Sequence, residues 1–286
     1  FFAPDQSKWW MRSHAMLPTP HRLDFDRYRV YFSGRNNLNQ SHIGWFDVDL
    51  TGSPKITAVS EDPVLKPGAL GCFDDNGVSP SSILQLSKDV LALYYIGWNP
   101  GSTVRLNLFG GLALSYDGGN SFERWSRSPI LERNITDPFL NTAPWVLRHQ
   151  NQLFMYYVSG TEWINRDLPR YNIKIATSDD GLHWTRLGKV VLDFEQGENA
   201  LARPAVYVEN GLWTMYISTK GEHYLIAMAT SLDGLNWTRA PKDMYLYPKP
   251  GDLGSTMVEY GVRLNSSHKN YILYNGDNYG EQGIGI

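Results

Sequence analysis

A pattern of alternating apolar and polar residues recurs along the chain in a fixed order: an aromatic stretch, a polar loop, a second apolar stretch and a Ser-x-Asp turn. The two clearest copies are Leu153–Trp184 and Leu212–Trp237, and looser copies begin at Arg29, Leu91 and Tyr271. One tyrosine anchors each copy, at a period of roughly 60 residues, which suits a four-stranded propeller blade with long loops. These tyrosines are Tyr31, Tyr95, Tyr157, Tyr216 and Tyr274.

An additional apolar stretch precedes each aromatic stretch and can supply the innermost strand of its unit. The pattern therefore predicts an all-β chain that forms a single five-bladed β-propeller of four-stranded antiparallel blades, with one domain over residues 1–286. The prolines in 12–23 are expected to shorten the first inner strand. We expect the segment 1–11 to supply the missing outer strand of the last blade. The expected blades span 12–60, 73–132, 140–193, 201–246 and 254–286.

Composition and charge narrow the class of ligand. Hydrophobic residues make up 42% and charged residues 19%, with 26 Gly and 16 Pro, which favours many short strands joined by tight turns. The net charge is −3 and no basic run occurs, which argues against nucleic acid or an anionic membrane as a partner. Cys72 is the single cysteine and cannot form an internal disulfide, so nothing in the chain demands an oxidising compartment; we expect a cytoplasmic protein, with a secreted or periplasmic location left open.

Three Ser-x-Asp turns follow the apolar stretches, at Ser115–Phe122, Ser178–Trp184 and Ser231–Trp237. The first fits the Asp-box pattern, and the other two are one residue shorter. Their Asp and Ser side chains can accept hydrogen bonds from turn amides, while the closing aromatic residue packs beneath the hairpin. We therefore interpret the acids of these turns as structural: Asp117, Asp180 and Asp233.

With these repeats and turns, the whole chain resembles the five-bladed propeller glycosidases, the broad group that holds glycoside hydrolase families 43, 32 and 130. Four stretches look more closely like the uncharacterised glycosidase-like propellers found with polysaccharide-synthesis proteins: Phe73–Ser81, Tyr156–Gly160, Ala202–Pro204 and Tyr274–Gly280. The resemblance implies a saccharide or glycoconjugate as the partner. Family 43 enzymes place acids at the starts of inner strands, and here those neighbourhoods lack them, so any catalytic acids must lie elsewhere.

Glycoside hydrolysis requires a proton donor for the leaving oxygen and a second carboxylate that acts as base or nucleophile. In a propeller, the axial pocket is lined by the starts of inner strands and by the loops that join second to third strands. We take Asp75 and Glu222 as the leading acid/base pair. The alternates in the same kinds of position are Asp74, Glu162, Glu259 and Asp277.

Other side chains are candidates for binding the saccharide. Arg203 stands before a proline on a predicted inner strand, where it needs an anionic partner from the protein or from the substrate. Trp98 and Trp163 end second strands and could offer flat faces to a sugar ring. His14 and Tyr279 could donate hydrogen bonds to hydroxyl groups.

No zinc-type cluster, phosphate-binding glycine loop or Gly-x-Ser-x-Gly motif occurs, so no cofactor is expected, although Ca²⁺ on the axial carboxylates is left open. The sequence thus favours a glycoside hydrolase, or a related phosphorylase or transferase, that acts through axial carboxylates. The alternative is a propeller without catalytic activity that binds glycans or serves as a scaffold in polysaccharide metabolism. The oligomeric state is left open.

Overall fold

The computed structural model describes residues 1–286 and is almost entirely β-sheet, as the sequence pattern predicts. Its strands fall into consecutive antiparallel groups. The first group holds β1 (Ser13–Arg22), β2 (Arg27–Arg35), β3 (Ser41–Asp49) and β4 (Lys55–Val59). The second holds β5 (Gly77–Ser87), β6 (Val90–Pro100), β7 (Leu106–Ser115) and β8 (Glu123–Arg124).

The third group holds β9 (Asn141–His149), β10 (Gln152–Asn165), β11 (Leu168–Ser178) and β12 (Thr185–Leu192). The fourth holds β13 (Ala200–Glu209), β14 (Leu212–Lys220), β15 (Tyr224–Ser231) and β16 (Thr238–Arg239), followed by the 3-10 turn η1 (Lys242–Met244). The last holds β17 (Glu259–Asn265), β18 (Asn270–Asn275), the helix α1 (Asp277–Gly280) and β19 (Ile284–Gly285). No helix is long and apolar enough to span a membrane.

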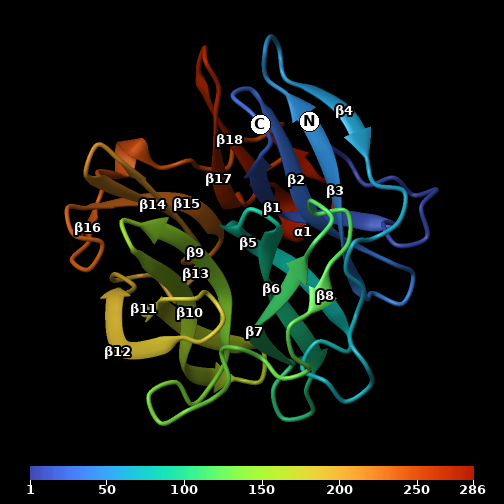
Figure 1. Cartoon of the computed structure of the whole chain (residues 1–286). Coiled ribbons are helices and arrows are strands. Elements are labelled where there is room, and N and C mark those ends of the chain that lie inside the picture. The colour runs from blue at the N-terminus through green and yellow to red at the C-terminus, as the bar shows by residue number, and fades with distance from the viewer.

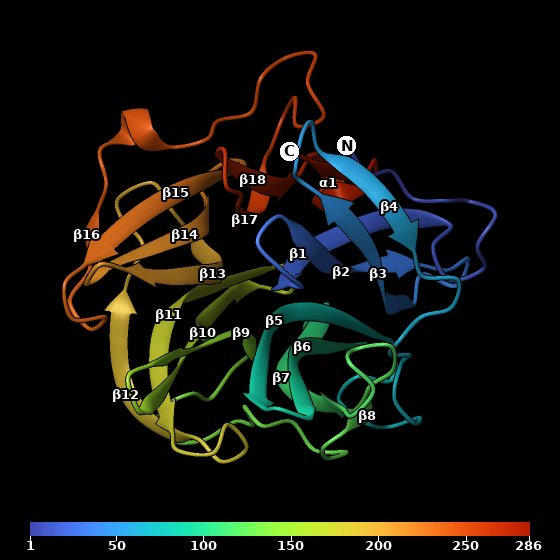
Figure 2. The ribbon, with the colours of Figure 1, turned by 45° about the horizontal axis from the view of Figure 1, so that its top comes forward.

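The groups follow one another around a common centre, so the N-terminal and C-terminal groups are neighbours (Figures 1 and 2). The first strand of each group contacts those of its neighbours in the order β1, β5, β9, β13, β17 and back to β1. A parallel bridge joins the third strand of one group to the first strand of the next, as between Ser41 and Gly77. The starts of the first strands therefore converge on one central region.

Buried tyrosines connect neighbouring groups. In three cases a hydroxyl on a second strand donates a hydrogen bond to the carbonyl of a glycine in the Ser-x-Asp turn of the following group. The pairs are Tyr31–Gly119 at 2.9 Å, Tyr94–Gly181 at 2.9 Å and Tyr156–Gly234 at 2.7 Å. Within each turn the Asp carboxylate accepts hydrogen bonds from the turn's own amides, as expected for a structural role.

The first strand differs from the expectation in one respect. Its prolines do not shorten it, and β1 runs for ten residues through Pro18 and Pro20. The pairing with β2 accommodates them through register shifts on either side of Met16, with Leu17 at a φ of 56°. Such irregularities bend a strand and re-aim its side chains, which is common next to functional sites.

The N-terminal segment does not form the predicted outer strand of the last group. Residues 1–11 meet β19 at one bridge only, through two backbone hydrogen bonds between Phe2 and Ile284. Trp10 and Met11 are fully buried against the first group instead, where the Trp10 ring lies 5.6 Å from that of Phe32. Burying these two large side chains is favourable and draws the segment toward the first group.

Candidate functional site

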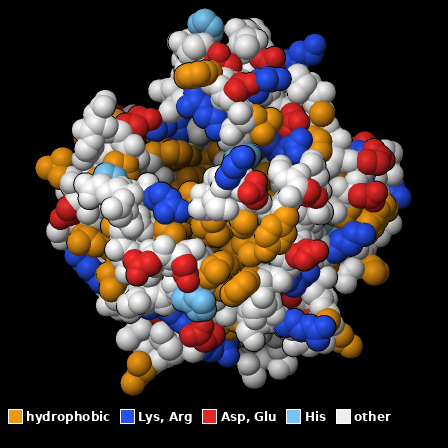
Figure 3. All heavy atoms as spheres, viewed as in Figure 1, with side chains coloured by type: hydrophobic (Ala, Val, Ile, Leu, Met, Phe, Trp, Pro, Cys, Tyr) orange, Lys and Arg blue, Asp and Glu red, His pale blue; other side chains and the backbone are white.

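A cavity of about 200 Å³ lies where the first strands meet, and each of the antiparallel groups contributes to its wall. We call it the axial pocket. On the face drawn in Figure 3, hydrophobic side chains gather near the centre, with Lys and Arg side chains around them. The residues that line the axial pocket are Met16, Leu17, Arg35, Ser79, Ile96, Trp98, Arg105, Leu106, Leu108, Tyr171, Tyr224, Tyr260 and Tyr279.

Aromatic side chains make up much of this wall, and their orientations are fixed by contacts. The Trp98 indole donates a hydrogen bond from Nε1 to Ser41 Oγ at 2.8 Å. The hydroxyls of Tyr171 and Tyr224 are hydrogen-bonded to each other, and burial raises the pKa of Tyr171 to about 12. Tyr279 packs edge-on against Tyr224, with ring centroids 6.2 Å apart. The pocket therefore offers flat apolar faces together with neutral hydroxyls, a combination suited to a sugar ring.

The backbone at the pocket is strained. Leu17, Tyr260 and Tyr279 all have φ near 60°, a conformation that residues with a Cβ rarely adopt. Buried polar side chains hold two of these residues in place: Asn275 Oδ1 accepts from the Leu17 amide, and Ser218 Oγ accepts from the Tyr260 amide, both at 2.7 Å. Strain of this kind persists only where the surroundings enforce it, and it concentrates at ligand sites.

Glu259 stands directly before Tyr260 and is completely buried. Neither carboxyl oxygen makes a hydrogen bond of ordinary geometry, although the Tyr260 hydroxyl and the Tyr279 backbone amide are near it. Burial raises the pKa of this carboxyl well above its usual value. Such a shift favours the protonated carboxyl, which is the form that a general acid requires.

Cationic side chains surround the pocket. Arg35 at the end of β2 and Arg105 just before β7 both line it, and neither forms a salt bridge. Lys220 is also close, with its ammonium group 5.3 Å from the centre of the Tyr224 ring. Burial, and then the charge of Arg105, lower the pKa of Lys220. The site thus carries a positive field with little nearby compensation.

The leading acids predicted from sequence do not line this pocket. Asp75 accepts a hydrogen bond from the Gly71 amide at 2.8 Å, beside the turn that precedes β5. Glu222 has a side chain that is 92% exposed, and it lines a second, open groove of about 400 Å³ next to Tyr224. The structure therefore does not bring Asp75 and Glu222 together at the axial pocket.

The alternates divide into distinct environments. Asp74 is buried in an ion pair with Arg124, and Glu162 forms an exposed pair with Arg170 at 3.0 Å. Asp277 accepts hydrogen bonds from the amides and hydroxyls of the segment that leads to β17. Burial alone would raise the pKa of Asp277, but these hydrogen bonds outweigh it and lower the pKa. Of the six predicted acids, Glu259 and Asp277 directly precede or lie close in sequence to the pocket residues Tyr260 and Tyr279, and burial, and then the charge of Asp277, raise the pKa of Glu259.

The predicted binding residues are also separated. Trp98 and Tyr279 line the axial pocket, whereas Trp163 packs at the edge of the main hydrophobic core. His14 is half-buried, and desolvation lowers its pKa to about 4, so its ring is neutral at physiological pH. Its Nδ1 atom lies 2.8 Å from Ser13 Oγ.

Arg203 is fully buried, but its partners are neutral. Its guanidinium donates to the carbonyls of Pro18, Ser81 and Tyr260 and to the Thr19 hydroxyl, over 2.8 to 3.1 Å. It also lies 5.3 Å from the centre of the Trp145 ring. These contacts join the first strands of several groups, and no carboxylate is among them.

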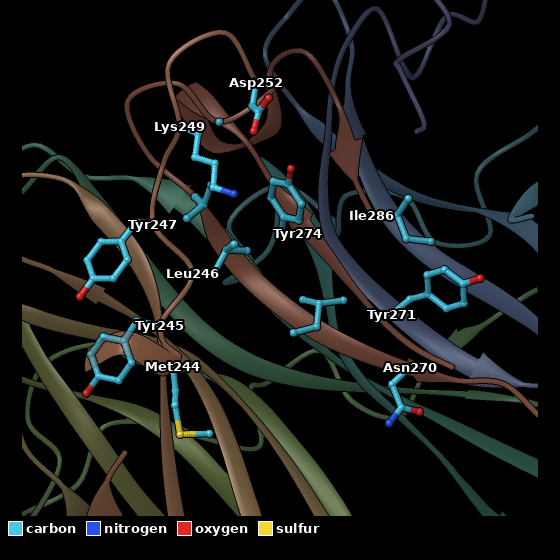
Figure 4. A pocket seen from close by; sticks show the side chains of 13 residues that line it. Met244, Tyr245, Leu246, Tyr247, Lys249, Asp252, Asn270, Tyr271, Tyr274 and Ile286 are labelled. Carbon is cyan, nitrogen blue, oxygen red and sulfur yellow. The ribbon is translucent and has the colours of Figure 1, made fainter. Parts of the chain in front are cut away.

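The largest cavity lies elsewhere. A groove of about 480 Å³ runs between the segment that follows η1 and the strand β18, and Figure 4 shows its side chains. Tyr245, Tyr247, Tyr271 and Tyr274 contribute most of its aromatic surface, and Lys249 and Asp252 supply its charges. This groove lies along the last group rather than at the centre, and no strained residue lines it.

Sequence reasoning missed Arg35, Arg105 and the cluster of tyrosines. Arg35 ends the aromatic stretch Arg29–Arg35, so its position at a second-strand end was a usable signal. Arg105 lies in the loop between β6 and β7, where the Arg105 amide donates to the Arg166 carbonyl at 2.9 Å. That contact joins loops of two groups and has no local signature. No group of three or more His, Cys, Asp or Glu side chains that could hold a metal ion is found.

Comparisons with known proteins place this geometry in context. No family model matches the chain. Two relatives from Mycobacterium tuberculosis, the uncharacterized proteins MT1551 and Rv1502, are each 39% identical to it over 287 residues. The match covers 100% of this chain and 95% of each relative.

Solved structures show the fold. The chain is similar to a glycoside hydrolase (TM-score 0.78, 19% identity, 99% of this chain and 88% of the other). It is also similar to the protein in a BT0996 RGII complex (TM-score 0.77, 19% identity, with the same coverage). A thermostable family-43 glycoside hydrolase gives a TM-score of 0.68 at 14% identity, over 95% of this chain and 86% of the other. The predicted likeness to glycosidase propellers is thus confirmed at the level of the fold.

Proposed function

This chain belongs to the family of the uncharacterized Mycobacterium tuberculosis proteins MT1551 and Rv1502, and we propose that it is a carbohydrate-active protein that acts on a glycosidic bond in its axial pocket. The glycosidase-like fold supports this proposal but is not sufficient evidence for it, because one fold hosts many functions. The observation that carries it is the environment of Glu259. A buried, unpaired carboxyl stands beside a pocket walled by Trp98 and tyrosines.

Glu259 is the proposed proton donor to the leaving oxygen. Burial raises its pKa and so favours the protonated carboxyl, which is the state that a general acid requires. Asp277 is the proposed second carboxylate, because its pKa is lowered while that of Glu259 is raised. Two carboxyl groups whose environments move their pKa values apart are typical of an acid paired with an ionised partner. The hydrogen bonds that the Asp277 oxygens accept hold this carboxylate in its ionised form, and we assign it the role of the base that accepts a proton from the attacking water.

A screen of aryl glycosides and oligosaccharides, with and without phosphate, tests this proposal. We expect Glu259→Gln to lower turnover about 10²- to 10⁴-fold, the usual contribution of a general acid. The control is Glu123→Gln on β8, whose side chain is exposed and makes no hydrogen bond. Asp75→Asn and Glu222→Gln test the pair favoured by sequence, and we expect little change from either. Absence of turnover on every substrate, or full activity of Glu259→Gln, would contradict the proposal.

A second candidate is a propeller without catalytic activity that binds glycans or acts as a scaffold in polysaccharide metabolism. One observation favours it: no carboxylate is among the residues that line the axial pocket. Calorimetric titration distinguishes the two candidates, because this one expects saccharide binding that depends on Trp98 but no product from any glycoside. Product formation that disappears in Glu259→Gln would exclude it.

We further propose that the antiparallel groups are the five blades of one propeller domain over residues 1–286. The cyclic order of contacts among β1, β5, β9, β13 and β17 supports this arrangement. Limited proteolysis of the folded protein is its test. A single domain should lose loops but no stable fragment of one or two groups, whereas release of such a fragment would point to separate domains.

A further inference from the structure

The two arginines of the axial pocket differ in their surroundings from four other arginines that are at least partly buried. Arg29, Arg124, Arg186 and Arg239 each reach a carboxylate, at distances from 2.8 to 3.4 Å. Arg35 has no carboxylate within salt-bridge distance: its Nη1 donates to Asn39 Oδ1 at 3.1 Å, and its Nε has no partner. Arg35 is partly desolvated and unpaired, which costs stability, so its retention calls for another explanation, whereas Arg105 is exposed.

Arg35 and Arg105 are close enough to repel each other. Desolvation lowers the pKa of Arg35 first, and the charge of Arg105 lowers it further. The nearby groups that oppose this effect are Tyr260, Tyr279 and the carboxylate of Glu281, which makes no salt bridge with either arginine. Two like charges held over one cavity create a positive potential directed into it.

The negative charges near the pocket are those of Asp277, whose oxygens already accept hydrogen bonds from the protein, and of Glu281, which makes no salt bridge with either arginine. Glu259 is a buried carboxyl next to the pocket residue Tyr260, and burial raises its pKa, which favours its neutral form. Lys220 adds a third cation beside Tyr224. An anionic group that enters the pocket would therefore gain charge-assisted hydrogen bonds from guanidinium groups that have no carboxylate partner in the protein.

The size and lining of the pocket define what carries this anionic group. A volume of about 200 Å³ is below that of pockets for drug-sized ligands, about 300–1,000 Å³, so it suits one sugar unit. Trp98 and the tyrosines provide faces for its ring, and the arginines provide partners for its charge. Resting on the proposed function, we propose that the axial pocket selects an acidic saccharide, with Arg35 and Arg105 binding its carboxylate or phosphate group.

Isothermal titration calorimetry on the full chain tests this selection with methyl glucuronide, glucose 6-phosphate and methyl glucoside. We expect at least one anionic sugar to bind about tenfold or more tightly than the neutral glucoside at low salt, with the advantage shrinking as salt is added. The two anionic probes distinguish a carboxylate from a phosphate as the preferred group. Equal or tighter binding of the neutral glucoside would overturn the inference and leave the proposed function intact.

Arg105→Gln is the decisive variant, because Arg105 is exposed and its replacement should not disturb folding. It should reduce the affinity for the anionic sugar about tenfold and leave that for methyl glucoside unchanged.

Arg35→Gln should act in the same direction, with thermal unfolding measured alongside because this residue is half-buried. Arg127→Gln is the matched control, since Arg127 is exposed and does not line the pocket. An anion preference that survives both pocket substitutions would overturn the assignment, and failure of every saccharide to bind would overturn the proposed function with it.

Discussion

The Asp74 carboxylate accepts a hydrogen bond from Arg124 Nε at 2.8 Å, across fifty positions of the chain, with the Asp74 side chain 1% exposed. The Tyr95 hydroxyl donates to the same oxygen at 2.9 Å. Two further groups repeat this relationship, each between an acid before the first strand and an arginine on the fourth: Asp137–Arg186 at 3.4 Å and Glu198–Arg239 at 2.9 Å. The repetition assigns Asp74 to a structural connection within its group.

Replacing Asp74 by Asn should therefore destabilise the protein. The substitution leaves Arg124 without its anionic partner in a largely buried site, and breaking such pairs costs about 3 kcal/mol or somewhat more. Urea unfolding measures the loss, and Asp75→Asn is the control because Asp75 is partly exposed and accepts only from the Gly71 amide. An unchanged unfolding free energy accompanied by loss of activity would return Asp74 to the catalytic candidates.

Asp74 illustrates which features of the protein could be predicted from the sequence and which could not. The repeat of anchoring tyrosines predicted the strands correctly, because alternation and period are local properties that each strand carries in its own residues. The role of Asp74 depends on Arg124, which approaches only when the fourth strand has paired. The same limit applies to the pocket: Arg35 ends β2 and Arg105 lies in the loop before β7, and only the packing of one group against the next brings them together.

The raised pKa of Glu259 predicts a specific dependence of stability on pH. Burial raises this pKa above the ordinary value of 4.5, so above about pH 4.5 the unfolded chain ionises the carboxyl while the folded chain keeps its proton. The folded state then binds more protons, and the contribution of Glu259 to the free energy of unfolding falls as the pH rises toward the folded pKa.

Glu259→Gln should remove that contribution, so the variant should gain stability relative to the parent as the pH rises from about 4.5 toward the folded pKa. Urea unfolding at several pH values within this window measures the difference, and Glu123→Gln, at an exposed position, should show no such trend. A difference between Glu259→Gln and the parent that stays constant with pH would show that the carboxyl is ionised in the folded protein.

Arg203 should prove to be a structural residue. Burial lowers its pKa to about 10, so it remains charged at neutral pH, and its four acceptors belong to the protein itself. Arg203→Met leaves those acceptors without a donor, which should cost about 3 to 5 kcal/mol of unfolding free energy. Arg203→Lys should recover part of this loss, because it keeps the charge but cannot reproduce the planar fork. A folded, equally stable Arg203→Lys that has lost saccharide affinity would instead support the role in binding that sequence suggested.

Trp98 and Trp163 were equivalent candidates in the sequence, and the structure predicts different outcomes for them. Trp98 lines the axial pocket with its ring fixed by the hydrogen bond to Ser41, whereas Trp163 does not line it. Removing a ring that packs on a sugar face loses buried apolar area, at about 25 cal/mol per Å². Trp98→Ala should therefore weaken saccharide binding about tenfold in calorimetric titration, and Trp98→Phe should restore part of the affinity.

Trp125→Ala, at an exposed position outside the pocket, serves as the control, and Trp163→Ala should behave like it. If Trp163→Ala weakens binding as much as Trp98→Ala does while both variants remain folded, the saccharide occupies a surface other than the axial pocket.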